Sequence, residues 1–166
     1  MTALAMDCLN PLLDACQQGR RHYVAAARSV GDPGLRLQFS HIASARATIL
    51  CDIAAVLGRD AAAEAAQDDP PAETAPAAAG RVVLGGEDHD EGLSPAELCA
   101  LVTALREQDE HILHQFRQHV DTIPCIATTQ VLERAIAVLC EDLEKIRILE
   151  SLTAGGAAES LRSTAQ

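Results

Sequence analysis

The sequence predicts an all-α protein, a four-helix bundle made of two helical hairpins joined by a long crossover. Apolar residues make up 48% of the 166 residues, yet the chain has only one tyrosine, two phenylalanines and no tryptophan. Alanine and leucine dominate this apolar content, which favours helices over sheets. Four segments of about 24–29 residues carry apolar side chains at helical spacings of three and four. A chain of this length can bury the core of one domain, so we expect a single domain over 1–166.

The first hairpin is predicted from two helices over about 7–30 and 33–57. Proline is tolerated in the first turn of a helix, so Pro11 indicates that the first helix begins only a few residues before it. Asp32 can cap the second helix, and Gly58 is placed to end it. The connection between these helices is only two or three residues long, so we expect them to lie antiparallel.

A long linker is predicted over 59–93. This stretch is rich in Ala, Pro, Asp and Gly, and such a composition buries too little apolar surface to order itself. The next helix is predicted over 95–120. Ser94 as N-cap with Glu97 three residues later forms a capping box, which is a specific signal for a helix start.

The last helix is predicted over 124–152, followed by a mobile tail over 153–166, because Gly155 and Gly156 are poor helix formers. The four helices therefore have similar lengths and are joined by a short, a long and a short connection. This order is typical of ferritin-like bundles rather than of simple up-and-down bundles.

Asp109 is the anomaly in this pattern. It lies near the centre of the apolar stripe of the third helix, between Leu105 and Ile112. A buried carboxylate needs a metal ion, a cation or several hydrogen-bond donors, since desolvation of an unpaired charge costs several kcal/mol. The partner of Asp109 is therefore the main functional question that the sequence raises.

Charge and cysteine usage narrow the classes of function. The net charge of −11 argues against nucleic acid or an anionic membrane as a partner. We expect no membrane span and no targeting segment, and hence a cytoplasmic protein. The six cysteines form no Cys-x-x-Cys pair, which favours reduced, structural thiols over a zinc or thioredoxin-type site; they are Cys8, Cys16, Cys51, Cys99, Cys125 and Cys140.

Several short motifs stand out in both hairpins. In the first hairpin they are Leu9-Asn10-Pro11-Leu12-Leu13, Gly19-Arg20-Arg21-His22-Tyr23, Asp32-Pro33-Gly34-Leu35 and Arg46, and in the third helix they are Asp109-Glu110 and Phe116. Together these motifs resemble a bacterial ferritin-like family of unknown function. The resemblance covers the hairpins but not the linker. It implies a ferritin-like bundle in which the family has acidic residues at the positions of Arg20, Ala45 and Asp109. The ligand pattern of a di-iron centre is therefore degraded in this chain.

A ferritin-type di-iron site needs one carboxylate from each of two helices and a Glu-x-x-His pair from each of the other two. The sequence contains no Glu-x-x-His. The remaining candidates for a divalent metal, iron or another, are Asp109, Asp52, Asp142 and His41. We therefore expect no cofactor and keep a ferroxidase-like di-metal protein as the alternative.

An ion pair can replace the metal. Arg20 and Arg46 both lie close to the centre of the apolar stripes of their helices, and either guanidinium could pair with Asp109. Arg20 is the partner that the sequence favours. The alternative is that both arginines extend to the surface and that Asp109 is hydrated.

A second possible metal motif lies in the third helix, where Glu107, Glu110, His111 and His114 are spaced by three and four residues. Helical angles place most of this set opposite the apolar stripe, so a solvated polar face is the favoured interpretation and a weak surface metal site is the alternative.

The sequence therefore predicts a non-catalytic bundle with a structural, stress-associated or protein-interaction role, which includes self-association or binding to another protein. Motifs for nucleophilic catalysis or phosphate binding are absent from the sequence. The alternative functions are the di-metal oxidoreductase and a redox sensor. A sensor would need an exposed thiol with a lowered pKa.

Overall fold

A computed structural model of the chain describes residues 3–59 and 93–163, with side chains for residues 6–59 and 93–155. Within these ranges the protein is all-helical with four helices and no strand, which confirms the predicted all-α class. The helices are α1 (Ala3–Ser29), α2 (Pro33–Leu57), α4 (Pro95–Val120) and α5 (Ile126–Ser163). The predicted linker over 59–93 lies outside the described residues apart from its two ends.

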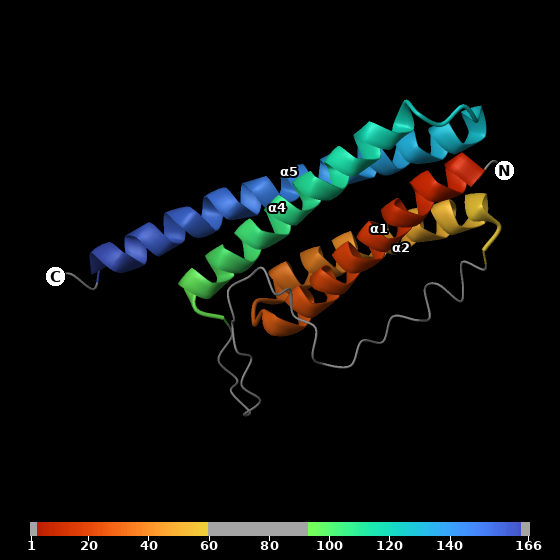
Figure 1. The fold of residues 1–166 in the computed structure, drawn as a ribbon. Helices are drawn as coiled ribbons and strands as arrows, with labels where there is room; N and C mark the ends of the chain where they lie inside the picture. Colours follow the sequence, from red (N-terminus) through yellow and green to blue (C-terminus); the bar gives the residue numbers. More distant parts are fainter. Residues whose placement is uncertain (1–2, 60–92, 164–166) are drawn as a thin grey trace.

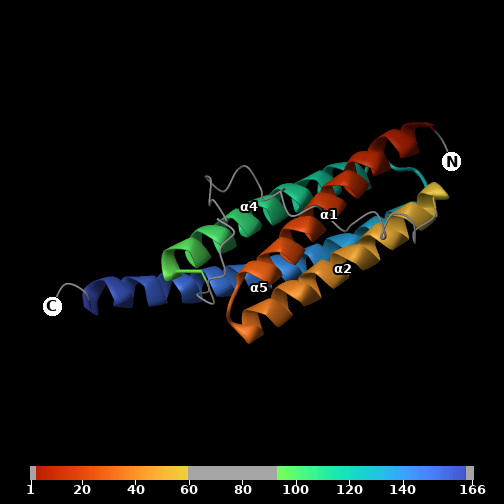
Figure 2. The ribbon, with the colours of Figure 1, turned by 90° about the horizontal axis from the view of Figure 1, so that it is seen from below.

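The four helices pack as two pairs. α1 lies beside α2 and α4 lies beside α5, and the two pairs are stacked on each other (Figures 1 and 2). Arg59, just after α2, donates from Nη1 to Oδ1 of Asn10 at 3.4 Å, so the end of α2 lies close to the early turns of α1. α5 continues past the ends of the other helices at its C-terminal side (Figure 1).

Capping residues fix the helix ends that the sequence predicts. The Asp32 side chain accepts a hydrogen bond from the Leu35 backbone N–H at 2.8 Å, which starts α2. Gly58 ends α2 with φ of 71°, a left-handed conformation that suits glycine. Ser94 and Glu97 form the predicted capping box at the start of α4.

Two helix ends differ from the prediction. α1 begins at Ala3, which places Pro11 inside the helix. Pro11 is exposed, so water can satisfy the carbonyl that loses its backbone partner there. α5 begins at Ile126 and extends to Ser163, through the glycines that were expected to end it. Each glycine costs about 1 kcal/mol relative to alanine inside a helix, and two of them do not end this 38-residue helix.

The core consists of two apolar clusters along the length of the bundle. One contains Leu13, Ile53 and Phe116, and the other contains Phe39, Val102 and Ile146. Buried charged residues from three helices lie where these clusters meet. Arg46 of α2 and Asp109 of α4 fall between the two clusters along their helices, and Asp142 of α5 lies beside Leu143 at the end of the first cluster. The interior therefore has a charged layer between two apolar layers.

By length and composition alone, α2 is apolar enough to cross a membrane, with a mean hydropathy of 1.3 in its most apolar window, of which 39% is buried in the protein. Core helices of water-soluble bundles have the same composition. Arg46 lies within this helix and is fully buried in the bundle, as expected for packing against other helices.

Candidate functional site: a buried charge cluster

Arg46 and Asp109 form an ion pair at the centre of the bundle. Arg46 Nη2 lies 2.9 Å from Asp109 Oδ1, and the two side chains are 0% and 1% exposed. The atoms are close, but the guanidinium N–H is not aligned for a hydrogen bond to that oxygen. The partner of Asp109 is thus a cation from the other helix pair, because α2 supplies Arg46 and α4 supplies Asp109.

Tyr23 of α1 holds the other oxygen of the carboxylate. Its hydroxyl donates to Asp109 Oδ2 at 2.6 Å, within the range of a charge-assisted hydrogen bond. The Arg46 guanidinium also lies 6.0 Å from the centre of the Tyr23 ring, at the outer limit of a cation–π contact. Tyr23 packs against Phe39 with ring centres 6.1 Å apart, so the aromatic contact helps to keep the hydroxyl directed at Asp109.

Asp142 of α5 brings a second carboxylate into the layer. Asp142 is 2% exposed. Lys145, whose side chain is half-exposed, donates from Nζ to Asp142 Oδ1 at 3.4 Å, which is long for a hydrogen bond. Oδ2 of Asp142 has no hydrogen-bond partner among the described residues. Asp142, which the sequence offered only as a metal candidate, is thus a buried carboxylate.

The layer therefore combines one buried cation with two buried carboxylates. Burial raises the pKa of Asp109, and the Arg46 charge and the Tyr23 hydrogen bond oppose this effect. Burial likewise raises the pKa of Asp142, again opposed by Arg46. The pKa of Tyr23 lies well above its usual value, through burial first and then the Asp109 charge. Arg46 Nε and Nη1 have no hydrogen-bond partner in the described part of the chain, so the cluster is charge-paired but not saturated with hydrogen bonds.

Of the two arginines that the sequence proposed, Arg46 is the one in the ion pair with Asp109. Arg20, which the sequence favoured, is only partly buried in α1. The two pairs of helices gain one further polar link at this level, a side-chain hydrogen bond between His22 and Gln108. His22, Tyr23 and Arg46 of the first pair thus all reach the part of α4 around Asp109.

Only two residues of the metal alternative, Asp109 and Asp142, share the buried layer. Asp52 and His41 of α2 are exposed, whereas Asp109 and Asp142 are buried. None of the histidines in the described ranges is buried, and these ranges contain no group of three or more His, Cys, Asp or Glu side chains placed to hold a metal. The arrangement around Asp109 fits a guanidinium partner better than a ferritin-type ligand set.

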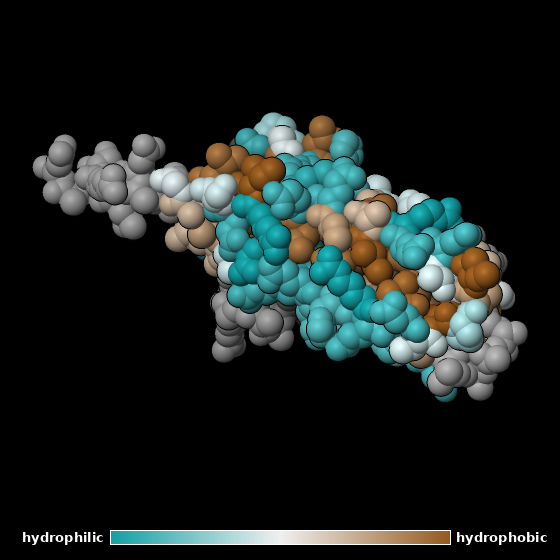
Figure 3. Space-filling model, turned by 90° about the horizontal axis from the view of Figure 1, so that it is seen from above, coloured by the Kyte–Doolittle hydropathy of each residue, from teal (hydrophilic) through white to brown (hydrophobic). Residues whose placement is uncertain are grey.

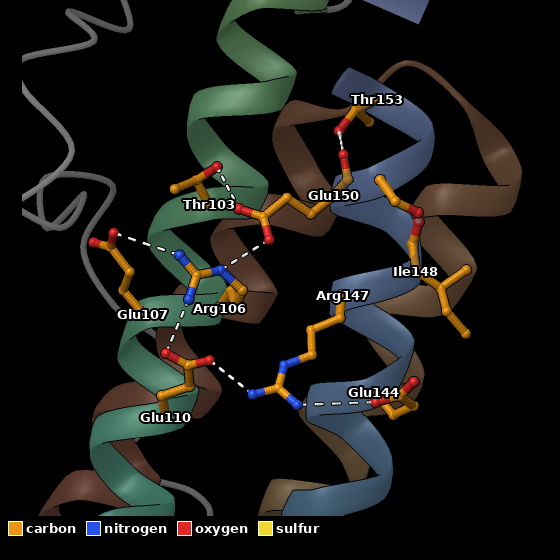
Figure 4. A network of polar contacts seen from close by, with 10 residues as sticks. Thr103, Arg106, Glu107, Glu110, Glu144, Arg147, Ile148, Glu150 and Thr153 are labelled. Atoms are coloured by element: carbon orange, nitrogen blue, oxygen red, sulfur yellow. Dashed lines mark hydrogen bonds and ion pairs between the residues drawn. The ribbon is translucent and has the colours of Figure 1, made fainter. Parts of the chain in front are cut away.

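The second possible metal motif, which consists of Glu107, Glu110, His111 and His114, lies on the surface of α4. Its histidines and its glutamates contact different partners. His111 and His114 are exposed and form hydrogen bonds with Gln115 and Gln118. Glu107 and Glu110 instead take part in an ion-pair network between α4 and α5 (Figure 4). Its other members are Thr103, Arg106, Glu144, Arg147 and Glu150.

On the α4 and α5 side of the molecule, hydrophilic groups alternate with apolar patches (Figure 3). Arg106 bridges Glu110 at 2.9 Å and Glu150 at 2.8 Å, and Arg147 reaches the other oxygen of Glu110 at 2.9 Å. Because Arg106 and Arg147 pair with its two carboxylate oxygens, Glu110 is a member of a salt-bridge network rather than an open metal ligand.

The cysteines of the described ranges are free. Cys16 is buried beside the charge cluster, and burial raises the pKa of its thiol to about 12. Cys125 is exposed just before α5. Hydrogen bonding from the Thr128 side chain, followed by the backbone of Thr128 and Ala127, lowers its pKa. Cys125 is therefore the thiol with the chemical environment that reactivity requires.

Comparison of the chain with models of protein families, with curated proteins and with solved structures finds no match. Functional inference therefore rests on the residues and their geometry.

Proposed function

We propose that the chain is a non-catalytic ferritin-like bundle of two antiparallel hairpins, with a structural or protein-interaction role in the bacterial cytoplasm. The observation that carries the proposal is the Arg46 guanidinium, which lies 2.9 Å from the buried carboxylate of Asp109 and also acts electrostatically on Asp142. A di-metal protein places cations between carboxylates at the corresponding level of a bundle. In this chain the Arg46 guanidinium supplies the positive charge at that level.

A structural role follows from where the partners originate. Tyr23 and Arg46 belong to the first hairpin, whereas Asp109 and Asp142 belong to the second. Two helix pairs that meet only through apolar layers can pack in several relative positions. A shift of the charged layer, in contrast, would leave buried charges unpaired. The cluster therefore fixes the register in which the two hairpins pair, and the bundle becomes a rigid scaffold that presents its outer faces.

Metal analysis tests this proposal. The protein is purified after growth with added iron, manganese and zinc, then titrated anaerobically with Fe(II), and its metal content is measured. We expect far less than one ion per chain, and the same result for Asp109→Asn and for the surface control Asp14→Asn. Near-stoichiometric iron in the parent protein that Asp109→Asn removes and Asp14→Asn retains would overturn the proposal and favour the di-metal alternative.

A further inference from the structure

The outward face of α2 carries a ridge of five exposed residues spaced by four: Arg36, Ser40, Ser44, Thr48 and Asp52. Each of its three hydroxyl groups donates to the backbone carbonyl four residues earlier, at 2.8 Å for Ser40, 2.9 Å for Ser44 and 3.3 Å for Thr48. Their donors are thus satisfied within the helix. Another helix can therefore cover this part of the ridge without leaving these hydroxyl donors unpaired.

α2 is poor in acidic residues, although the whole chain is strongly acidic. The protein carries a net charge of −11, so two copies repel each other over most orientations. Asp52 is the only acidic residue in the sequence of α2. At the other end of the same ridge lies Arg36, which also donates from Nη2 to the Val30 carbonyl at 3.2 Å. The ridge therefore has a positive end, an uncharged middle and a negative end.

An apolar flank adjoins the ridge. Leu37 is 59% exposed, and Ile148 of the neighbouring α5 is 54% exposed. Between the two helices lies a shallow groove of about 260 Å³, lined by Gly34, Leu37, Gln38, His41, Ile42 and Lys145. Leu37 and Ile42 line this groove and add apolar contact area on this side of α2.

We propose that this face of α2 binds a second copy of the chain, with the two α2 helices antiparallel around a two-fold axis at Ser44. Arg36 and Asp52 each lie eight residues from Ser44, so the two-fold operation places Arg36 of each copy at the Asp52 end of the other. Ridges of residues spaced by four pack side by side when helices cross at about −50°. The self-complementary charge pattern is what a symmetric interface requires, because each patch must match itself.

The proposed dimer rests on the interaction role proposed above and names its partner. An α2 face of 25 residues is about 38 Å long, and one helix face with a flank from α5 lies at the small end of specific interfaces. We therefore expect a weak, concentration-dependent dimer rather than an obligate one. A lipid surface is the competing occupant of an apolar helix, and the charged ends of the ridge favour the second copy over lipid.

Analytical ultracentrifugation over a wide range of protein concentrations tests the proposal with charge variants at exposed positions. Arg36→Asp and Asp52→Arg each place like charges opposite each other, and each is expected to weaken dimerisation at least tenfold. The double variant Arg36→Asp/Asp52→Arg restores opposite charges and is expected to recover the dimer. Ser44→Glu brings two carboxylates together on the axis and should abolish it. The matched control is Ala137→Glu, which adds the same charge on an exposed position of α5.

Circular dichroism checks that each variant is folded, and sedimentation with neutral phosphatidylcholine vesicles tests the lipid alternative. A parent protein that stays monomeric, a dimer that all α2 variants leave intact, or vesicle binding that Ser44→Glu removes would each overturn the proposal. A monomer without bound metal would refute the dimer and leave the proposed scaffold intact. Stoichiometric iron would instead refute the scaffold, whatever the oligomeric state.

Discussion

Arg46 and Asp109 lie 2.9 Å apart in the middle of the bundle, on helices separated by the crossover, and neither side chain is more than 1% exposed. A buried ion pair adds little net stability relative to well-packed apolar residues, but the loss of one partner is costly, because the other charge stays buried and unpaired. In line with the proposed structural role, we interpret the pair as a constraint on how the two helix pairs match rather than as a source of stability.

Removal of either partner should destabilise the fold strongly. For Asp109→Asn or Arg46→Met we expect a decrease of about 3–5 kcal/mol in the free energy of unfolding, measured by urea denaturation. The double variant Arg46→Met/Asp109→Leu should lose much less than the sum of the two single variants, since it leaves no unpaired charge at this pair. Glu110→Gln is the surface control and should cost at most about 1 kcal/mol. Additive losses in the double variant would show that the pair is not coupled.

Tyr23→Phe tests the hydrogen bond to Asp109 separately from the ion pair. The substitution keeps the ring that packs against Phe39 and removes only the hydroxyl that donates at 2.6 Å. We expect a loss of about 1.5–3 kcal/mol in the free energy of unfolding, because the acceptor is a charged group. Ser29→Ala, which removes a hydroxyl bonded to the Ala26 carbonyl, is the control with a neutral acceptor. An equal or smaller loss in Tyr23→Phe would contradict the assigned role.

Sequence reasoning predicted the helices best where local chemistry defines their ends. Asp32, Gly58 and the Ser94 capping box each act through neighbouring residues, so their signals are contained in a few positions of sequence. The end of α5 differs from the prediction because glycine makes a helix less stable but does not prevent it from continuing. The start of α1 differs from the prediction because Pro11 is tolerated as an exposed residue inside the helix.

The charge cluster was only partly predictable. The burial of Asp109 followed from its place in an apolar stripe, but the choice of Arg46 over Arg20 depends on how the helices are rotated and stacked, which periodicity does not specify. The hydrogen bond from Tyr23 to Asp109 is a feature that the sequence analysis does not predict. An aromatic residue with a hydroxyl near a predicted buried acid was the available signal, since a buried tyrosine hydroxyl usually finds a partner.

Cys125 should be the most reactive thiol of the described residues. Its pKa is lowered by hydrogen bonding from Thr128, so more thiolate is present near neutral pH. Iodoacetamide labelling of the native protein, followed by mass spectrometry, should modify Cys125 first and Cys16 only after unfolding. Thr128→Val removes the hydroxyl at similar size and should slow the labelling of Cys125 several-fold. Unchanged labelling in this variant would contradict the proposed activation.

Asp142 gives the stability of the bundle a particular dependence on pH. Burial raises its pKa in the folded protein, so the folded state keeps a proton that the unfolded chain, with an aspartate pKa of about 3.9, has already released. The contribution of Asp142 is therefore most favourable below that value and declines as pH rises through its folded pKa. Glu97 and Glu110 have lowered pKa values and act in the opposite direction, since their stabilisation is lost on acidification below the unfolded glutamate pKa of about 4.3.

Asp142→Asn separates these contributions. The amide has nearly the same shape but does not titrate, so the variant should be more stable than the parent at pH 7, where the parent must bury the charge, and this advantage should shrink as the pH is lowered toward 4. Chemical denaturation at a series of pH values measures the difference between the two proteins, in which the shared effects of Glu97 and Glu110 cancel. Asp14→Asn, at an exposed site, should show a nearly constant difference from the parent. An advantage of Asp142→Asn that grows on acidification would mean that Arg46 and Lys145 outweigh the cost of burial and hold Asp142 charged in the folded state.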